Sequence, residues 1–170
     1  MRTEYLLQRE VDHVLAALMP QNRLIMEVAL HTGLRIGDVL AMTPDMIKPQ
    51  GWLTEAKTGK RRRYGLPDEL RRRILAQASA EWAFPGRVPG KPKTRQAVWA
   101  DVKRAAKAFR LPQNVAPHSF RKVYAVELMR KYGDVEKVQR VLGHSRPSVT
   151  AIYAMADVLL DRKIAAKGKL

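Results

Sequence analysis

The chain has 170 residues, of which 46% are apolar, enough to bury a hydrophobic core and to argue against a chain disordered throughout. Its 32 Lys and Arg residues against 16 Asp and Glu residues give a formal net charge of +16, so a polyanionic partner is expected, with nucleic acid the leading candidate. The sequence has no cysteine, which excludes disulfides and thiolate metal sites.

Other classes of site are also disfavoured. No apolar run approaches the ~20 residues that a membrane span requires, and the charged N-terminus does not have the pattern of a signal peptide. The four histidines lack the close spacing of a metal motif. We therefore expect no membrane partner, no metal and no cofactor, in a soluble chain of intracellular type.

The N-terminal half begins with helical periodicity. Residues 8–18 place apolar side chains on one face and are followed by Pro20, where the first helix is expected to end. The stretch NRLIMEVALHTG predicts a second helix, with Gly33 as its C-terminal stop. A third, short helix is expected after Arg35.

The pattern changes at residues 51–67, GWLTEAKTGKRRRYGLP, which show no helical period. A Thr-Gly pair between two short stretches containing Trp, Leu, Thr and Tyr predicts a β-hairpin. Helical periodicity resumes over residues 67–79. Residues 84–93 contain three prolines and two glycines and are expected to form a loop.

The C-terminal half again favours helices. Thr94 is a plausible N-cap for a helix with a buried stripe at Val98, Val102, Ala105 and Phe109. Three more helices are expected, in SFRKVYAVELMRKYG, in DVEKVQRVLG and around Tyr153. The predicted fold class is mostly α with a small antiparallel β-hairpin or sheet.

Several polar residues have ordinary explanations when each is taken alone. Arg35 and Asp38 form either a surface ion pair or a guanidinium group held by a carboxylate and directed at a phosphate. His118 and Arg121, at i and i+3, share one side of a helical turn. His144 follows a helix end, as a capping group does, and Tyr153 has the setting of a half-buried core residue.

Together, and in this order, TGLRIGDVLAM, AKTGK, HSFRKVYAVELM and VQRVLGHSRPSVTAIY resemble the catalytic domain of the tyrosine recombinases, the phage-integrase family. The spacings of 23 residues from Arg121 to His144 and of nine from His144 to Tyr153 fit the family pattern. The resemblance covers about residues 7–156. It implies the tyrosine recombinase catalytic-domain fold and a site-specific recombinase that cleaves and rejoins DNA through a 3′-phosphotyrosine, without metal or ATP.

The resemblance also implies a role for each matching residue. The implied catalytic residues are Arg35, Lys57, His118, Arg121, His144 and Tyr153, with Asp38 in support. The tyrosine is the nucleophile, the two arginines hold the non-bridging oxygens, and the histidines assist at the phosphate. The lysine protonates the leaving 5′-oxygen, and Lys60 is the alternative to Lys57 for this role.

The resemblance implies double-stranded DNA as the partner, bound by a homotetramer that is monomeric when it is not on DNA. It also implies a cytoplasmic protein that associates with the nucleoid of a bacterial host or serves a phage or mobile element. The basic candidates for DNA contacts outside the catalytic set are Lys60, Arg61, Arg62, Arg63 and Arg95, although a solvated face is the default for such charge runs. Residues 1–170 are read as one catalytic domain. The tail, residues 157–170, is expected to pack either on a neighbouring protomer or on its own domain. The family's N-terminal core-binding domain is expected to be absent from residues 1–170.

Two other functions remain open from the sequence. A type IB topoisomerase uses the same residue types and nicks and closes DNA without recombination. A non-catalytic DNA-binding protein on the same fold is the second alternative, against which the complete set of catalytic residue types argues.

Overall fold

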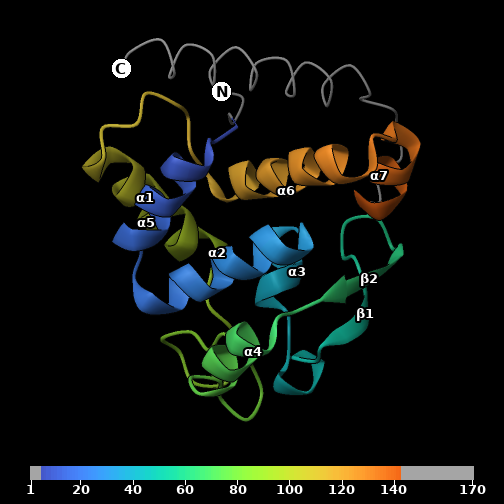
Figure 1. Cartoon of the computed structure of the whole chain (residues 1–170). Helices are drawn as coiled ribbons and strands as arrows, with labels where there is room; N and C mark the ends of the chain where they lie inside the picture. Colours follow the sequence, from blue (N-terminus) through green and yellow to red (C-terminus); the bar gives the residue numbers. More distant parts are fainter. Residues whose placement is uncertain (1–4, 143–170) are drawn as a thin grey trace. The chain divides into compact units, whose positions relative to one another are not determined.

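The computed structural model describes residues 5–142, and the predictions that concern residues 143–170 lie outside them. The chain divides into two compact units at Tyr124, inside helix α6. The first unit contains α1 (Gln8–Ala17), α2 (Pro20–Thr32), α3 (Ile36–Leu40), the 3-10 turn η1 (Pro44–Met46), β1 (Gln50–Thr54), β2 (Arg61–Gly65), α4 (Asp68–Leu75), α5 (Arg95–Ala108) and the start of α6 (Pro117–Tyr132) (Figure 1). The predicted class, mostly helical with a small antiparallel hairpin, is confirmed.

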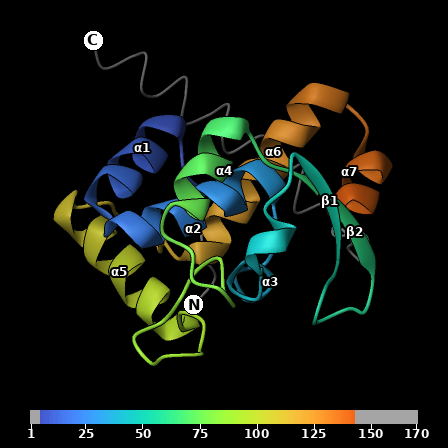
Figure 2. The same ribbon diagram turned by 90° about the horizontal axis from the view of Figure 1, so that it is seen from below.

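Helix α2 is the centre of the first unit. It contacts α1, α3, α4 and β2, and its buried apolar residues point in several directions around the helix axis, as expected for a core helix. Pro20 does not end α1, which stops at Ala17; it occupies the first turn of α2, where its missing N–H leaves no hydrogen bond unmade. Figures 1 and 2 show α1, α2 and α5 grouped together and the hairpin beside α3.

Helix α5 begins at the predicted cap, because the Thr94 hydroxyl accepts a hydrogen bond from the Ala97 N–H over 3.2 Å. Three of the four predicted stripe positions are fully buried: Val98, Val102 and Ala105. The prediction for Phe109 is wrong: it lies beyond the last helical residue, is 40% exposed and stacks on His13 at 4.6 Å between ring centroids.

The hairpin pairs β1 with β2 in antiparallel register, from Gln50 opposite Gly65 to Thr54 opposite Arg61. The connection is longer than a two-residue turn: residues 55–60 form the loop, and Gly59 of the predicted Thr-Gly pair adopts a left-handed φ of 66°. Along β2 the side chains alternate between exposed Arg61 and Arg63 and buried Arg62 and Tyr64. This alternation directs one arginine of the basic run into the protein.

The second unit contains the end of α6 and α7 (Val135–Leu142) among the described residues. The prediction of these two helices is confirmed. Gly133, at φ 61°, follows the last residue of α6, and the Asp134 carboxylate accepts a hydrogen bond from the Lys137 N–H at the start of α7. No helix within residues 5–142 has the length and apolar character needed to cross a membrane.

Gly33 gives a test of the close packing between α2 and α6. Its φ is 61°, and a Cβ atom there would lie 2.1 Å from Tyr124 Cδ1. We expect Gly33→Ala to lower the free energy of unfolding by about 1–2 kcal/mol from the left-handed backbone and by a further ~1–3 kcal/mol from overpacking, as measured by urea denaturation. Gly59→Ala is the control, since Gly59 has a similar φ of 66° and no atom within 4 Å. Equal losses in the two variants would contradict this account of Gly33.

Candidate active site

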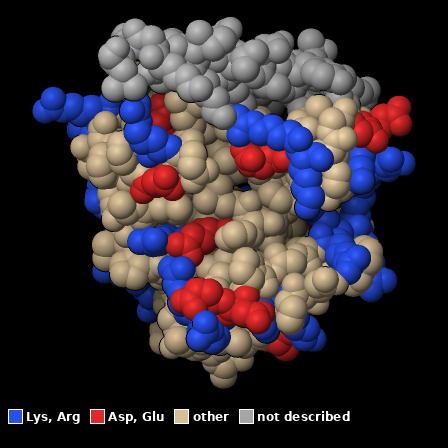
Figure 3. All heavy atoms as spheres, viewed as in Figure 1, with Lys and Arg blue, Asp and Glu red and all other residues tan. Residues whose placement is uncertain are grey.

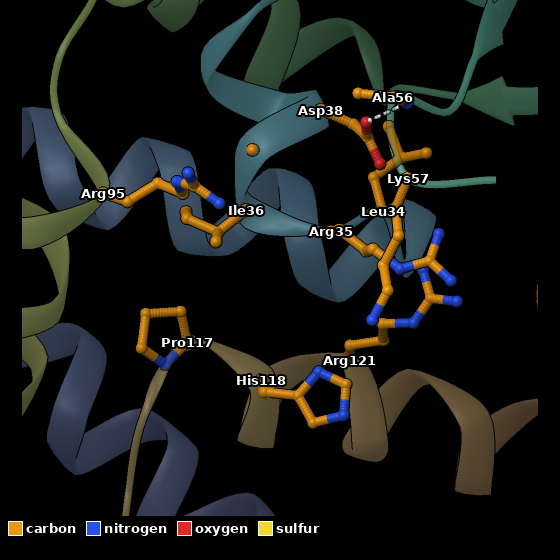
Figure 4. A pocket seen from close by; sticks show the side chains of 11 residues that line it. Leu34, Arg35, Ile36, Asp38, Ala56, Lys57, Arg95, Pro117, His118 and Arg121 are labelled. Atoms are coloured by element: carbon orange, nitrogen blue, oxygen red, sulfur yellow. Dashed lines mark hydrogen bonds between the residues drawn. The ribbon is translucent and has the colours of Figure 1, made fainter. Parts of the chain in front are cut away.

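A pocket of about 460 Å³ lies in the first unit, where four separate segments meet. Its lining comes from the start of α3, the hairpin loop, the start of α5 and the start of α6 (Figure 4). Four of the six predicted catalytic residues line it: Arg35, Lys57, His118 and Arg121. The structure thus brings together residues that lie up to 86 positions apart in the sequence.

Local structure explains how each side chain reaches this pocket. The left-handed Gly33 ends α2 and turns the chain, so that Arg35 becomes the N-cap residue of α3. His118 and Arg121 stand on the first turns of α6 and point into the same space in Figure 4. Lys57 is exposed on the loop between β1 and β2. The three segments contribute cationic or titratable groups to one opening.

The carboxylate that binds Arg35 is Glu55, which corrects the predicted pairing with Asp38. Arg35 Nη1 donates to Glu55 Oε2 over 2.5 Å. Asp38 is buried and accepts a hydrogen bond from the Ala56 N–H over 3.0 Å. Asp38 therefore supports the hairpin loop next to Lys57 rather than the guanidinium group of Arg35.

Glu55 is fully buried and contacts two further arginines. Its Oε1 lies 3.3 Å from Arg62 Nη1 and 3.7 Å from Arg121 Nη1. Its Oε2 accepts a hydrogen bond from the Thr58 hydroxyl over 2.8 Å. One carboxylate thereby partly balances three guanidinium groups, as a buried charge cluster requires.

The electrostatics of this cluster keep Glu55 and Arg121 charged at neutral pH. Burial alone would raise the pKa of Glu55, but hydrogen bonds from Thr58 and Arg35 and the charges of Arg35 and Arg121 hold this pKa below its ordinary value. Burial, together with the charges of Arg62 and Arg35, lowers the pKa of Arg121 to about 10, against the opposing effect of Glu55 and Asp38. Arg121 thus remains a cation at pH 7.

The predicted DNA contact of Arg62 is contradicted by its position. The residue is 5% exposed, and its guanidinium group donates to the carbonyls of Thr32 over 2.5 Å and Gly33 over 3.1 Å. Because β2 alternates, Arg62 points to the same side as the buried Tyr64. Arg62 is a structural arginine of the cluster and has no surface to offer to DNA.

The other four basic candidates are exposed: Lys60, Arg61, Arg63 and Arg95. On the face in Figure 3, Lys and Arg side chains gather over the hairpin, while Asp and Glu side chains lie around α4 and at several places above it. Arg61 lies over the Trp52 ring, 5.1 Å from its centroid, and Arg95 lines the pocket itself. Their contacts with DNA stay predictions.

Two predicted catalytic residues, His144 and Tyr153, lie outside the described residues, and their roles also stay predictions.

Glu55 was missed by the sequence interpretation. A signal for it existed, because Glu55 is the sole acidic residue between Asp45 and Asp68 in a strongly basic stretch. Within residues 5–142, no group of three or more His, Asp or Glu side chains is placed to hold a metal ion.

The fold is that of tyrosine recombinase catalytic domains. The structure of the XerA recombinase matches it with a TM-score of 0.75 at 18% identity, over 98% of this chain and 64% of that one. The catalytic domain of bacteriophage HP1 integrase matches with a TM-score of 0.64 at 22% identity, over 96% of this chain and 95% of that domain. Both recombinase structures therefore share the fold in which the pocket lies.

The sequence itself identifies the family. Residues 4–158 match the phage integrase family, so the chain belongs to it. A putative integrase/recombinase of Sinorhizobium fredii, y4qK, is 32% identical over 152 residues, which cover 85% of this chain and 49% of that protein. Tyrosine recombinase XerD of Pseudomonas putida is 29% identical over 150 residues, 81% of this chain and 50% of XerD. The chain thus spans about half the length of these two relatives.

The Glu55 cluster predicts a specific dependence of stability on pH. We expect Glu55→Gln to lower the free energy of unfolding at pH 7 by about 3–5 kcal/mol, because buried cations lose their counter-charge. Since the pKa of Glu55 is lowered in the folded protein, its stabilisation is complete above the ordinary value of 4.5 and is lost as the pH falls through the folded value. The gap between wild type and variant, measured by urea denaturation, should therefore narrow below about pH 4.5.

The control is Glu69→Gln. Glu69 is 67% exposed and pairs with Arg72 at the surface, so its loss should change the free energy of unfolding by no more than about 0.5 kcal/mol. A gap between wild type and Glu55→Gln that stays constant from pH 7 to pH 3 would refute the assignment of an ionised, paired Glu55.

Proposed function

We propose that this protein is a site-specific DNA recombinase that cleaves and rejoins DNA strands with a tyrosine nucleophile. The observation that supports this most is the convergence of Arg35, Lys57, His118 and Arg121 on one pocket, in a chain that belongs to the phage integrase family. In two similar structures, XerH is bound to its difH substrate before cleavage and to a palindromic difH substrate after it. We extend DNA as a substrate from XerH to this chain.

The charge of the pocket suits a phosphodiester. The cluster contains three guanidinium groups, from Arg35, Arg62 and Arg121, against the carboxylates of Glu55 and Asp38. One net positive charge remains, to which Lys57 adds another at the pocket wall. A phosphodiester with one negative charge is attracted to such a site, and the extra charge that develops in the transition state is stabilised by donors already in place.

The proposed reaction keeps the number of high-energy bonds constant. The Tyr153 oxygen attacks the scissile phosphorus and passes its proton to His118 or His144, a 3′-phosphotyrosine bond forms, and the bond to the 5′-oxygen breaks. Lys57 gives its proton to that oxygen, so a 5′-hydroxyl leaves. Rejoining runs the same steps backwards with a new 5′-hydroxyl as nucleophile. Neither ATP nor a metal ion is needed, because the bond energy is conserved and the cations neutralise the phosphate.

The protein binds duplex DNA through its exposed cations and assembles there. Duplex DNA contacts the exposed cations Lys60, Arg61, Arg63 and Arg95, which supply attraction that does not depend on base sequence. Four copies assemble on DNA, as exchange between two cleaved duplexes requires four active tyrosines. Such a reaction places the protein on cytoplasmic DNA.

We expect Tyr153→Phe to abolish the covalent protein–DNA adduct while leaving the dissociation constant for DNA within a few-fold of wild type. The substitution removes the nucleophilic hydroxyl and none of the cations. The measurement uses nicked duplexes that trap the adduct, drawn from a library of candidate sites. An adduct formed by the phenylalanine variant would assign the nucleophile elsewhere, with Tyr124 and Tyr132 the next candidates.

The acid role of Lys57 has its own test. Lys57→Ala should slow cleavage of a normal phosphodiester by about 10²–10⁴-fold, the usual range for a lost general acid. A substrate with sulfur in place of the bridging 5′-oxygen should restore the rate, because a thiolate leaves without a proton. Arg121→Ala is the control and should not be rescued, since its task is to stabilise charge on non-bridging oxygens. Rescue of Lys60→Ala in place of Lys57→Ala would move the acid role to Lys60.

A further inference from the structure

One buried carboxylate connects the two arginines that line the pocket. Glu55 Oε2 accepts a hydrogen bond from Arg35 over 2.5 Å, and Glu55 Oε1 lies 3.7 Å from Arg121 Nη1. The two oxygens of a carboxylate have a fixed separation. Because each oxygen contacts a different guanidinium group, Glu55 constrains how far apart Arg35 and Arg121 lie.

Arg62 completes this arrangement from the side of the protein interior. It shares one acceptor with Arg121, the Gly33 carbonyl, which accepts from Arg121 over 2.6 Å and from Arg62 over 3.1 Å. Glu55 Oε1 accepts a hydrogen bond from Arg62 over 3.3 Å and lies 3.7 Å from Arg121 Nη1. Arg62 is not among the residues that line the pocket. Its hydrogen bond therefore helps to hold the Glu55 carboxylate in place from outside the pocket lining.

Glu55 also holds the loop that carries Lys57. The Thr58 hydroxyl donates to Glu55 Oε2 over 2.8 Å, and the Gly59 N–H donates to the Glu55 carbonyl over 2.9 Å. On the other side of Lys57, the Ala56 N–H donates to Asp38. The backbone that flanks Lys57 is thus fixed to the same cluster that holds the arginines.

We propose that Glu55 is a positioning residue for strand cleavage, which sets the spacing of Arg35 and Arg121 for two non-bridging oxygens of one phosphodiester and fixes the Lys57 loop beside them. The inference rests on the proposed function for the identity of the reaction. The physical reason is preorganisation: donors that are already fixed need no reorganisation when charge develops on the phosphate. Behind the guanidinium groups, the Glu55 carboxylate accepts a hydrogen bond from Arg35 and the Gly33 carbonyl accepts one from Arg121, so each arginine is held by a fixed acceptor.

The test compares Glu55→Gln with Glu69→Gln, two variants with the same change in net charge. On the nicked duplex that traps the wild-type adduct, at saturating protein, Glu55→Gln should cleave about 10²-fold more slowly, the usual effect of a misplacement near 1 Å. Its dissociation constant for DNA should be equal to that of wild type or lower, because the pocket becomes more positive. Glu69→Gln should cleave at the wild-type rate. A purely structural role would weaken DNA binding and cleavage together.

Glu55→Asp keeps the experiment decisive if the glutamine variant does not fold. Aspartate retains the charge and so preserves folding, but its shorter side chain cannot contact both arginines in the same way. We expect a thermal midpoint above that of Glu55→Gln, because the counter-charge is retained, and a cleavage rate at least about 10-fold below wild type, since misplaced donors stabilise the transition state less well. Wild-type cleavage by folded Glu55→Asp would overturn the positioning role.

A separate measurement tells the failure of this inference from the failure of the proposed function. In ¹⁵N spectra of the protein without DNA, the side-chain Nε–H signals of Arg35 and Arg121 should be narrow in wild type and Glu69→Gln, and broadened or shifted in Glu55→Asp. If wild type forms no adduct, the proposed function is wrong, and these signals still decide whether Glu55 holds the arginines. Unchanged signals in Glu55→Asp would overturn the inference.

Discussion

A single ionised carboxylate, fully buried among three guanidinium groups, is the interaction on which the site depends. Glu55 lies within 3.7 Å of Arg35, Arg62 and Arg121, and no other residue among 5–142 pairs with more than one of these arginines in an ion pair. Bringing such charges out of water is costly unless each has a partner. The cost is offset here because the carboxylate and the carbonyls of Thr32 and Gly33 supply acceptors to the buried arginines. The same set of contacts gives the buried guanidinium groups fixed acceptors and leaves a net positive charge at the pocket.

Gly33 shows how closely fold and site are joined. Its left-handed backbone ends α2, its missing side chain leaves room for the Tyr124 ring of α6, and its carbonyl accepts hydrogen bonds from both Arg62 and Arg121. A residue with a Cβ atom would disturb the packing of α6 and, through it, the place of Arg121 on that helix. The turn that separates α2 from α3 therefore also determines where two elements of the pocket meet.

The sequence predicted what local chemistry determines. The helices were predicted from apolar periodicity, and the hairpin was predicted from the break in that periodicity. The cap at Thr94 and the stop at Gly33 were predicted from the residue types at those two positions. The partner of Arg35 was mispredicted because the nearer carboxylate in sequence, Asp38, is not the nearer one in space. Glu55 comes from a different element, and such a pairing depends on tertiary contacts. Arg62 was predictable in part: the alternation that buries Tyr64 and Leu66 also buries Arg62, but a run of four basic residues hid that pattern.

The strongly basic composition separates, in this structure, into cations with two different physical tasks. Arg62 and Arg121 are buried and held by fixed acceptors, and Arg35 is held by one charge-assisted hydrogen bond while lining the pocket. Fixed, planar groups of this kind suit the recognition of a phosphate whose charge increases during reaction.

The second group of cations is exposed on the hairpin: Lys60, Arg61 and Arg63. Water and salt screen these charges, which act at longer range by attracting a polyanion. Lys57 lies between these groups: it lines the pocket, yet its long stem is exposed, which suits a group that must reach a leaving oxygen rather than hold an oxygen in place. Since the hairpin carries Glu55, Lys57 and the exposed cations within nine residues, a shift of this one element would move the counter-charge of the arginines, the pocket lysine and the exposed cations at once.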